Sequence, residues 1–270
     1  MSPIKNVWYC LQYDITRNYW HFKDKCSEYH GIVLMFHHIT DEDVAINESC
    51  KCGVEDFRRV LLSYIEQGYE FVSIEKALSM IQNSELSRFV VVTFDDIPDS
   101  VYLNAYPILE ELSIPFAIFV TVGFIDKDCY ITKQHLLELC TVPLCTIGAH
   151  TMTHPMLRQV DNAKWEIEQS KKELESIVGM PVKYFAYPYG QYSSVSKEVR
   201  NAVADSGYEC AFCTIGSSLN NTSTRDPFFL PRFSPTPDKN AIGKYKFTTP
   251  RAIASLLFWP IRKLRALTKR

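Results

Sequence analysis

Two histidines four residues apart stand in the segment 150–155, His-Thr-Met-Thr-His-Pro. On a helix this spacing would place both rings on one face, as in zinc sites of the His-Glu-x-x-His type. Here a threonine follows His150, and Pro155 disfavours a helical conformation at His154, so we expect the pair on a loop. Two imidazoles and a carboxylate would bind zinc, iron, cobalt or nickel and leave positions open for water and substrate. Two packed or exposed histidines without a metal are an equally open interpretation.

Two other polar segments could contribute to such a site. Asp95 and Asp96 follow an apolar, β-branched run. Adjacent carboxylates at a strand end point in different directions, so they can take different roles, although turn acids or a helix cap would look the same. The turn Tyr187-Pro188-Tyr189-Gly190 offers flat aromatic faces on a restricted backbone, but by itself it reads as an ordinary turn.

Alternating strands and helices position these segments. Parallel strands are indicated, because the strands are continuously apolar and the connections are long enough for crossovers. The polar segments all follow strands, at the strand ends where α/β barrels and open α/β sheets place their sites. Hydrophobic patterning alone does not separate these two architectures. We expect strands at 32–36, 89–94, 115–122, 145–149, 183–186 and 209–214, and helices at 54–68, 75–81, 102–112, 132–140, 161–178 and 195–206.

Composition narrows the class of protein. The 270 residues are 46% hydrophobic and 22% charged, which is ordinary for a globular protein and excludes global disorder. A net charge of −2 gives no electrostatic basis for nucleic-acid binding. The nine scattered cysteines predict reduced thiols in a cytoplasmic protein, and we interpret Cys50–Cys52 and Cys210–Cys213 as structural. Neither a signal peptide nor a membrane span is expected from the apolar pattern.

Taken in order, the segments 93–96 (TFDD), 150–155 (HTMTHP) and 185–190 (FAYPYG) resemble the signatures of polysaccharide deacetylases, the NodB-homology or carbohydrate esterase family 4. The resemblance covers roughly residues 31–235. It implies an α/β fold, a distorted (β/α) barrel of the NodB-homology type with parallel strands. We therefore expect a catalytic domain at 31–245, between an N-terminal extension at 1–30 and a C-terminal tail at 246–270.

The resemblance also assigns roles to the motif residues. Asp95 would be the general base, and Asp96, His150 and His154 would hold one divalent metal ion, zinc in the first place and otherwise cobalt, nickel or iron. The turn Tyr187-Pro188-Tyr189 would line the substrate groove, and its backbone N–H would help to hold the oxyanion.

The sequence departs from the family pattern at three points. Ile97 stands where the family usually has glycine, and Ala186 stands where an arginine commonly orients the base. Arg232 is the candidate replacement, since a guanidinium can pair with a carboxylate through two hydrogen bonds. The late Leu-x-His motif is missing, because no histidine follows residue 190. Instead His37 resembles the strand-end histidine of rearranged members and would be the general acid, with His38 as the alternative.

The predicted function is a metal-dependent hydrolase that removes an N-acetyl group from an N-acetylated sugar or polysaccharide precursor and releases acetate. Three alternatives stay open: a C–N amide hydrolase of a non-sugar substrate, a non-catalytic glycan-binding relative and an iron oxygenase. The tail at 251–270 carries six basic residues, no acid and many apolar residues. It could lie on the inner face of the membrane or pack on the barrel as a terminal helix.

Overall fold

The computed structural model describes residues 31–42, 50–85, 88–220 and 223–235. The expected N-terminal extension at 1–30 and the tail at 246–270, including its basic segment 251–270, lie outside the described residues. Among the described helices, none is both long and apolar enough to cross a membrane.

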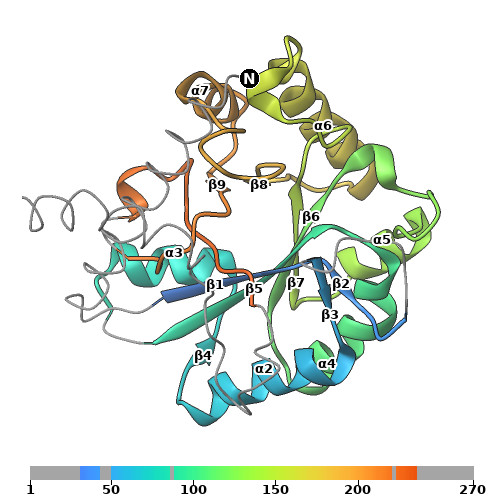
Figure 1. Cartoon of the computed structure of the whole chain (residues 1–270), viewed down its shortest axis with the longest axis vertical. Helices are drawn as coiled ribbons and strands as arrows, with labels where there is room; N and C mark the ends of the chain where they lie inside the picture. Colours follow the sequence, from blue (N-terminus) through green and yellow to red (C-terminus); the bar gives the residue numbers. More distant parts are fainter. Residues whose placement is uncertain (1–30, 43–49, 86–87, 221–222, 236–270) are drawn as a thin grey trace, which may run out of the picture.

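A curled parallel sheet forms the centre of the molecule (Figure 1). Its strands run in the order β1-β5-β6-β7-β8-β9. The short strand β4 lies outside this order and pairs with the first residues of β5, whose later residues pair with β6. Every pairing in this sheet is parallel, as the apolar strands predict. The strands are β1 (Gly31–Phe36), β4 (Glu70–Phe71), β5 (Phe89–Asp96), β6 (Phe116–Val120), β7 (Cys145–Ala149), β8 (Tyr184–Ala186) and β9 (Cys210–Phe212).

A short segment, Leu230–Phe233, joins the two edges of the sheet. On the β9 side, Leu230 exchanges backbone hydrogen bonds with Ala211 and Cys213, both 2.8 Å long. On the β1 side, the Phe233 N–H donates to the Val33 carbonyl at 2.8 Å, and its own carbonyl accepts from Met35 at 2.7 Å. The sheet is therefore closed into a distorted barrel, and the predicted fold class is confirmed.

Helices surround the sheet, with α2, α4, α5 and α6 on its outside (Figure 1). The expected helices are all present, and their ends differ from the expected ones by at most two residues when η2 and α4 are taken together. The helices are α2 (Val54–Glu66), α3 (Ile74–Gln82), η2 (Val101–Ala105), α4 (Tyr106–Glu111), η3 (Val122–Phe124), α5 (Lys133–Cys140), η4 (Leu157–Gln159), α6 (Ala163–Val178), α7 (Lys197–Asp205) and η5 (Ser223–Arg225). Two short strands, β2 (His38–Ile39) and β3 (Lys51–Cys52), form a separate parallel pair that is too short to show a sequence pattern.

The helix expected at 102–112 begins as a wider turn. Residues 101–105 form the π-helix η2, in which the Tyr106 N–H donates to the Val101 carbonyl. Pro107 follows and has no N–H with which to continue the usual helical bonding to residue 103. The proline therefore accounts for the change of helix type directly after the Asp95–Asp96 segment.

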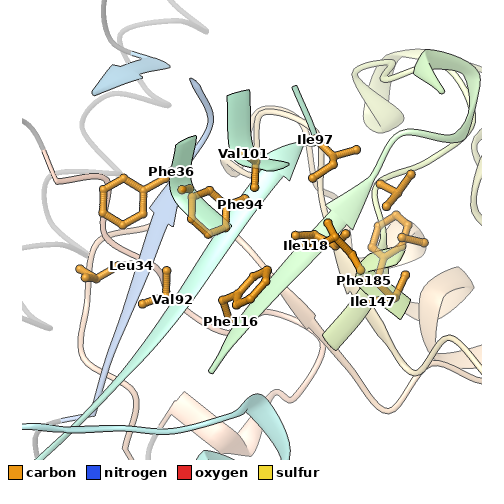
Figure 2. Packing of buried hydrophobic residues seen from close by; sticks show 14 of the residues in the cluster. Leu34, Phe36, Val92, Phe94, Ile97, Val101, Phe116, Ile118, Ile147 and Phe185 are labelled. Atoms are coloured by element: carbon orange, nitrogen blue, oxygen red, sulfur yellow. The ribbon is translucent and has the colours of Figure 1, made fainter. Parts of the chain in front are cut away.

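The core has one layer on each face of the sheet. Residues such as Leu34, Val92, Phe94 and Phe116 fill the layer between the strands and the outer helices (Figure 2). The alternate strand residues, among them Val91, Phe119 and Phe212, form the layer on the inner side of the curled sheet, to which α3 contributes. Because side chains alternate along β5, Asp95 falls on the inner side.

Candidate metal centre and active site

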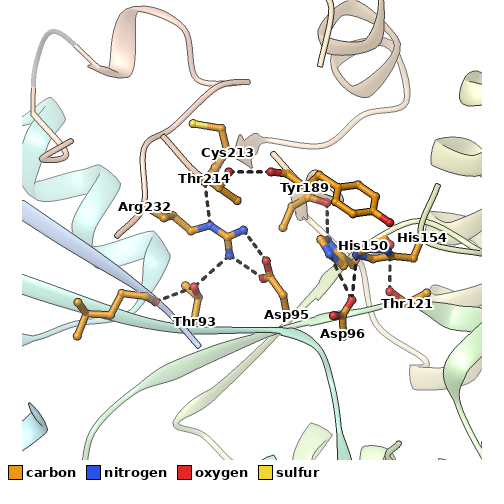
Figure 3. Close-up of polar contacts among 12 residues, drawn as sticks. Thr93, Asp95, Asp96, Thr121, His150, His154, Tyr189, Cys213, Thr214 and Arg232 are labelled. Atoms are coloured by element: carbon orange, nitrogen blue, oxygen red, sulfur yellow. Dashed lines mark hydrogen bonds and ion pairs between the residues drawn. The ribbon is translucent and has the colours of Figure 1, made fainter. Parts of the chain in front are cut away.

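The polar segments meet at one edge of the barrel (Figure 3). Asp95 and Asp96 end β5, His150 follows β7, Tyr187 follows β8, and His37 follows β1. Parallel strands bring their carboxyl ends to a common edge, so residues far apart in the sequence become neighbours here. The predicted clustering of the motif residues is what the structure shows.

Asp96, His150 and His154 form a potential metal centre. Each offers one ligand atom, and these atoms lie within 4.8 Å of one another. The Asp96 Oδ1 atom is 3.6 Å from His150 Nε2 and 3.2 Å from His154 Nε2. This carboxylate oxygen is buried and has no hydrogen-bond partner. A buried, unpaired carboxylate oxygen that faces two imidazole nitrogens fits a divalent cation.

The protonation states of the histidines also fit a metal. His150 Nδ1 lies 2.8 Å from the Ala186 carbonyl, which fixes the proton on Nδ1 and leaves the Nε2 lone pair free for a ligand. Burial lowers the pKa of His150 to about 3 and also lowers the pKa of His154. Both imidazoles are therefore neutral at pH 7, as metal ligation requires. Burial raises the pKa of Asp96 to about 6, which a bound cation would oppose.

The loops that carry these ligands have unusual backbone conformations. Asp96, Ile97, Thr151, His154 and Tyr189 all have φ between 55° and 69°, the left-handed region that favours glycine. Strand alternation would send the Asp96 side chain to the helix-facing side, and the left-handed turn redirects it toward the histidines. Ile97 adopts the conformation that the glycine usual in the family would favour, and its fully buried side chain offsets part of the backbone cost.

Asp95 has a different partner, Arg232. The guanidinium donates from Nη1 to Oδ1 at 2.7 Å and from Nη2 to Oδ2 at 2.6 Å. Two further N–H groups donate to the Cys213 carbonyl and the Thr93 hydroxyl, both at 3.1 Å. The Arg232 side chain is 0% exposed and lies over the Phe119 ring. Arg232 thus makes the two hydrogen bonds to Asp95 for which the sequence offered it as a replacement, since position 186 is alanine.

This pairing determines the charge of Asp95. Burial by itself would raise the pKa of the carboxyl group, but the Arg232 guanidinium, together with His150 and His37, outweighs burial, and the pKa falls to about 2. Asp95 is therefore ionised throughout the neutral range. Both of its oxygens are occupied by Arg232, in contrast to the free Oδ1 of Asp96.

His37 and His38 face different surroundings, as alternation after a strand predicts. His37 is half-buried and lies close enough to Asp95 and Asp96 to favour the ionised form of both, although burial keeps the net pKa of Asp96 raised. His38 is near Asp99, and its own pKa is lowered by burial and by the neighbouring His37. Of the two histidines, His37 is therefore the one beside the aspartates.

The turn after β8 differs from the sequence expectation. The Tyr187 side chain is 0% exposed, and its hydroxyl donates to the Phe228 carbonyl at 2.8 Å. Pro188 is buried as well. The expectation that these two side chains line a groove is wrong, because alternation after β8 places Tyr187 with Phe185 in the helix-facing core. Tyr189 is 52% exposed, and its ring centroid lies 5.0 Å from that of His154.

Two aromatic residues at this edge were missed by the sequence analysis. The Phe124 ring centroid lies 6.1 Å from that of His154 and 4.5 Å from that of Tyr130. Burial and the nearby charge of Asp96 raise the pKa of Tyr130, which places this residue beside the metal ligands. The available signal was their position after β6, whose carboxyl end reaches the same edge as those of β5 and β7.

The thiols of the described cysteines contact none of the three potential metal ligands. All seven lack a disulfide, and Cys210 and Cys213 are buried. Burial raises the pKa of Cys213 to about 12, so its thiol stays protonated. The structural interpretation of the 210–213 pair therefore agrees with its surroundings.

Comparison with known proteins agrees with the geometry. Residues 82–211 match the model of the polysaccharide deacetylase family. YxkH of Bacillus subtilis (strain 168) is 24% identical over 217 residues, which cover 79% of this chain and 75% of YxkH. A poly-β-1,6-N-acetyl-D-glucosamine N-deacetylase of Staphylococcus aureus is 29% identical over 118 residues, which cover 38% of this chain and 41% of that protein.

Solved structures show the same fold. BC0361, a polysaccharide deacetylase from Bacillus cereus, superposes with a TM-score of 0.68 at 22% sequence identity, over 84% of this chain and 68% of that one. The match of the family model includes both aspartates of the first motif and both histidines of the second. Residues 82–211 therefore match the polysaccharide deacetylase family, and the similar YxkH carries the same family name.

Proposed function

We propose that the protein is a metal-dependent N-deacetylase that hydrolyses the acetamide of an N-acetylated sugar, within a polysaccharide or its precursor. One observation carries the proposal: an ionised carboxylate held by a buried arginine, Asp95 with Arg232, stands next to a ligand set with a free oxygen, Asp96 with His150 and His154. The first group would supply a general base, and the second, directly beside it, would bind a cation. The name of the Staphylococcus aureus relative supports an N-acetylated glycan as the substrate class.

Asp96, His150 and His154 would hold the ion, with zinc as the first candidate because two imidazoles and one carboxylate with open positions suit it. Cobalt, nickel and iron are alternatives with the same donor preference. When bound, the ion would lower the pKa of a water molecule and polarise the acetamide carbonyl. No other group of three such residues is found in the part of the chain that the structure describes.

The protein's own residues would then move the protons. Asp95 accepts the proton of the attacking water, and Arg232 keeps the carboxylate ionised and fixed in orientation. The Tyr189 N–H, which makes no hydrogen bond among the described residues, donates to the oxyanion that forms on the carbonyl oxygen. His37, protonated, donates to the sugar nitrogen as the C–N bond breaks, because an amine anion is too basic to leave. Acetate and a free amino sugar result.

An aromatic edge suits a sugar as the substrate. Tyr189 and Tyr130 flank the metal ligands on different loops, and Phe124 packs between Tyr130 and His154. Aromatic faces bind the apolar C–H faces of sugar rings while hydroxyl groups stay hydrated. A small non-sugar amide would use the same catalytic groups but would gain little from these rings.

The test is release of acetate from a panel of N-acetylated sugars, free, polymeric and carrier-linked, with and without a chelator. We expect acetate release that a chelator abolishes and zinc restores. Asp95→Asn should lower turnover by roughly 10²–10⁴-fold, the usual contribution of a positioned base, while metal binding is retained. The matched control is Asp128→Asn at an exposed position, which should leave turnover unchanged. Unchanged turnover in Asp95→Asn would contradict the proposal.

A further inference from the structure

A buried carboxylate lies under the loop that joins the two histidines. Glu166 stands in the first turn of α6, and the residue is only 2% exposed. Its Oε2 accepts hydrogen bonds from the backbone N–H groups of Met152 at 3.0 Å and Thr153 at 2.9 Å. Its Oε1 accepts from the Thr153 hydroxyl at 2.7 Å. All three donors therefore belong to the two residues between Thr151 and His154.

Glu166 has no cationic partner among the described residues, whose ion pairs all involve other acids. Burying a carboxylate without a counter-charge is costly unless hydrogen bonds replace its hydration. Two successive N–H groups that converge on one oxygen form the kind of concave backbone site that binds anions. All three hydrogen bonds of the Glu166 carboxylate are thus directed to this one loop.

The loop needs such support because its backbone is strained. Thr151 and His154 have φ values of 69° and 60°, and left-handed conformations in non-glycine residues persist only where surrounding contacts fix them. On the other side of the loop, η3 holds the carbonyl groups. The Val122 N–H donates to Thr151 at 3.1 Å, and the Gly123 N–H donates to Met152 at 2.8 Å. Glu166 binds the N–H groups, and η3 binds the carbonyl groups.

We propose that Glu166 is a positioning residue of the metal centre, which fixes the 151–153 loop so that the Nε2 atoms of His150 and His154 converge on Asp96. Glu166 is not itself a ligand, because both of its oxygens are engaged by the loop. Without the carboxylate, the two N–H groups lose their acceptor and the strained loop has a reason to relax. Binding of the ion would then have to fix the positions of the two histidines, and the free energy that this requires would weaken the affinity for the ion. This proposal rests on the metal centre of the proposed function.

The test compares zinc affinity, measured by competition with a chromophoric chelator, in the wild type and three variants. Glu166→Ala should weaken zinc binding by about 10–100-fold, the usual effect of losing a group that orients metal ligands. Glu166→Gln should stay within a few-fold of the wild type, because the amide oxygen can accept both N–H bonds and the amide nitrogen can donate to the Thr153 hydroxyl. Glu168→Ala, an exposed position two residues along α6, is the control and should have no effect.

A folded Glu166→Ala variant with wild-type zinc affinity would overturn the proposal. If that variant does not fold, Thr153→Ala decides, because it removes only the hydroxyl bond at an exposed residue. It should weaken zinc binding by about 2–10-fold, the effect of one hydrogen bond, and an unchanged affinity would equally overturn the proposal. The absorption spectrum of the cobalt-loaded protein should shift in Glu166→Ala and remain the same in Glu168→Ala.

These outcomes separate the two proposals. A wild-type protein that binds zinc but releases no acetate would contradict the deacetylase function, and the zinc affinities of the variants would still decide the role of Glu166. A wild-type protein that binds no divalent ion would contradict both.

Discussion

Replacement of Arg232 by methionine is the most informative perturbation of the active site. Methionine fills a similar volume beside the Phe119 and Phe212 rings, but it removes the guanidinium that pairs with both oxygens of Asp95. Breaking a buried ion pair by removing one partner costs about 3–5 kcal/mol, because the other charge stays buried without compensation. We therefore expect Arg232→Met to lower the free energy of unfolding by this amount at neutral pH.

The pH dependence of this loss follows from the pKa of Asp95. In the wild type the pKa is lowered from 3.8 to about 2, so the ionised group contributes about 2 kcal/mol, present above pH 3.8 and lost as the pH falls through about 2. In Arg232→Met, burial is no longer outweighed and the pKa of Asp95 rises above 3.8. When a carboxyl group has a higher pKa in the folded than in the unfolded state, the free energy of unfolding increases as the pH falls through that higher pKa. The difference between wild type and variant should therefore shrink from pH 7.5 to pH 4.5.

Urea unfolding of the metal-free proteins at several pH values measures both effects. The control is Arg58→Met, which removes a partly exposed surface arginine that also makes two bonds to one carboxylate, that of Glu111. Exposed pairs contribute at most about 1 kcal/mol, so this variant should change little at any pH. A destabilisation by Arg232→Met that is no larger than that of Arg58→Met, or that stays constant between pH 7.5 and pH 4.5, would refute the reasoning. In the loaded enzyme, Arg232→Met should lose turnover and keep its metal.

Three further predictions concern single side chains. His150→Ala should lose zinc at neutral pH, which metal analysis of the purified protein would detect, and full occupancy would exclude His150 as a ligand. His37→Ala should keep zinc affinity and lose turnover by roughly 10²–10⁴-fold, whereas His38→Ala should lose much less, and steady-state kinetics that reverse this order would assign the acid to His38. Ser113→Gly should raise the free energy of unfolding by about 0.5–1 kcal/mol, because Ser113 is exposed after α4 with a φ of 54°, and a lower melting temperature would contradict this.

Much of the fold could be predicted because its main elements have strong local patterns. The run 89–94 of apolar and β-branched residues predicted β5, and Gly179 with Pro181 predicted the end of α6. The closure of the barrel could not be predicted in this way. The segment Leu230–Phe233 contributes only two isolated bridges, one to each edge strand, and four residues with a proline among them carry no strand periodicity.

The sequence predicted which residues form the candidate site better than it predicted where their side chains point. Residue types and motif order identified Asp96, His150 and His154, and the structure brings them together. The side-chain directions depend on backbone angles that alternation does not describe, as at Asp96 with its φ of 63°. Tyr187 is the opposite case, because alternation does describe it. Alternation continued past β8 places its side chain in the core with Phe185, whereas the motif suggested a groove residue. Glu166 gave no signal, because one glutamate on a polar helix looks like a solvated residue.

Asp95 and Asp96 show how neighbouring residues of one type acquire opposite chemistry. The pKa of Asp95 is lowered to about 2 and that of Asp96 is raised to about 6, although a single peptide bond separates them. The left-handed turn at Asp96 sends one carboxylate to Arg232 inside the barrel and the other to the two histidines. Since Asp95 already has a cation and Asp96 has a buried oxygen without one, a divalent ion would be directed to Asp96. The same division leaves Asp95 ionised and uncoordinated, which is the state that a general base needs.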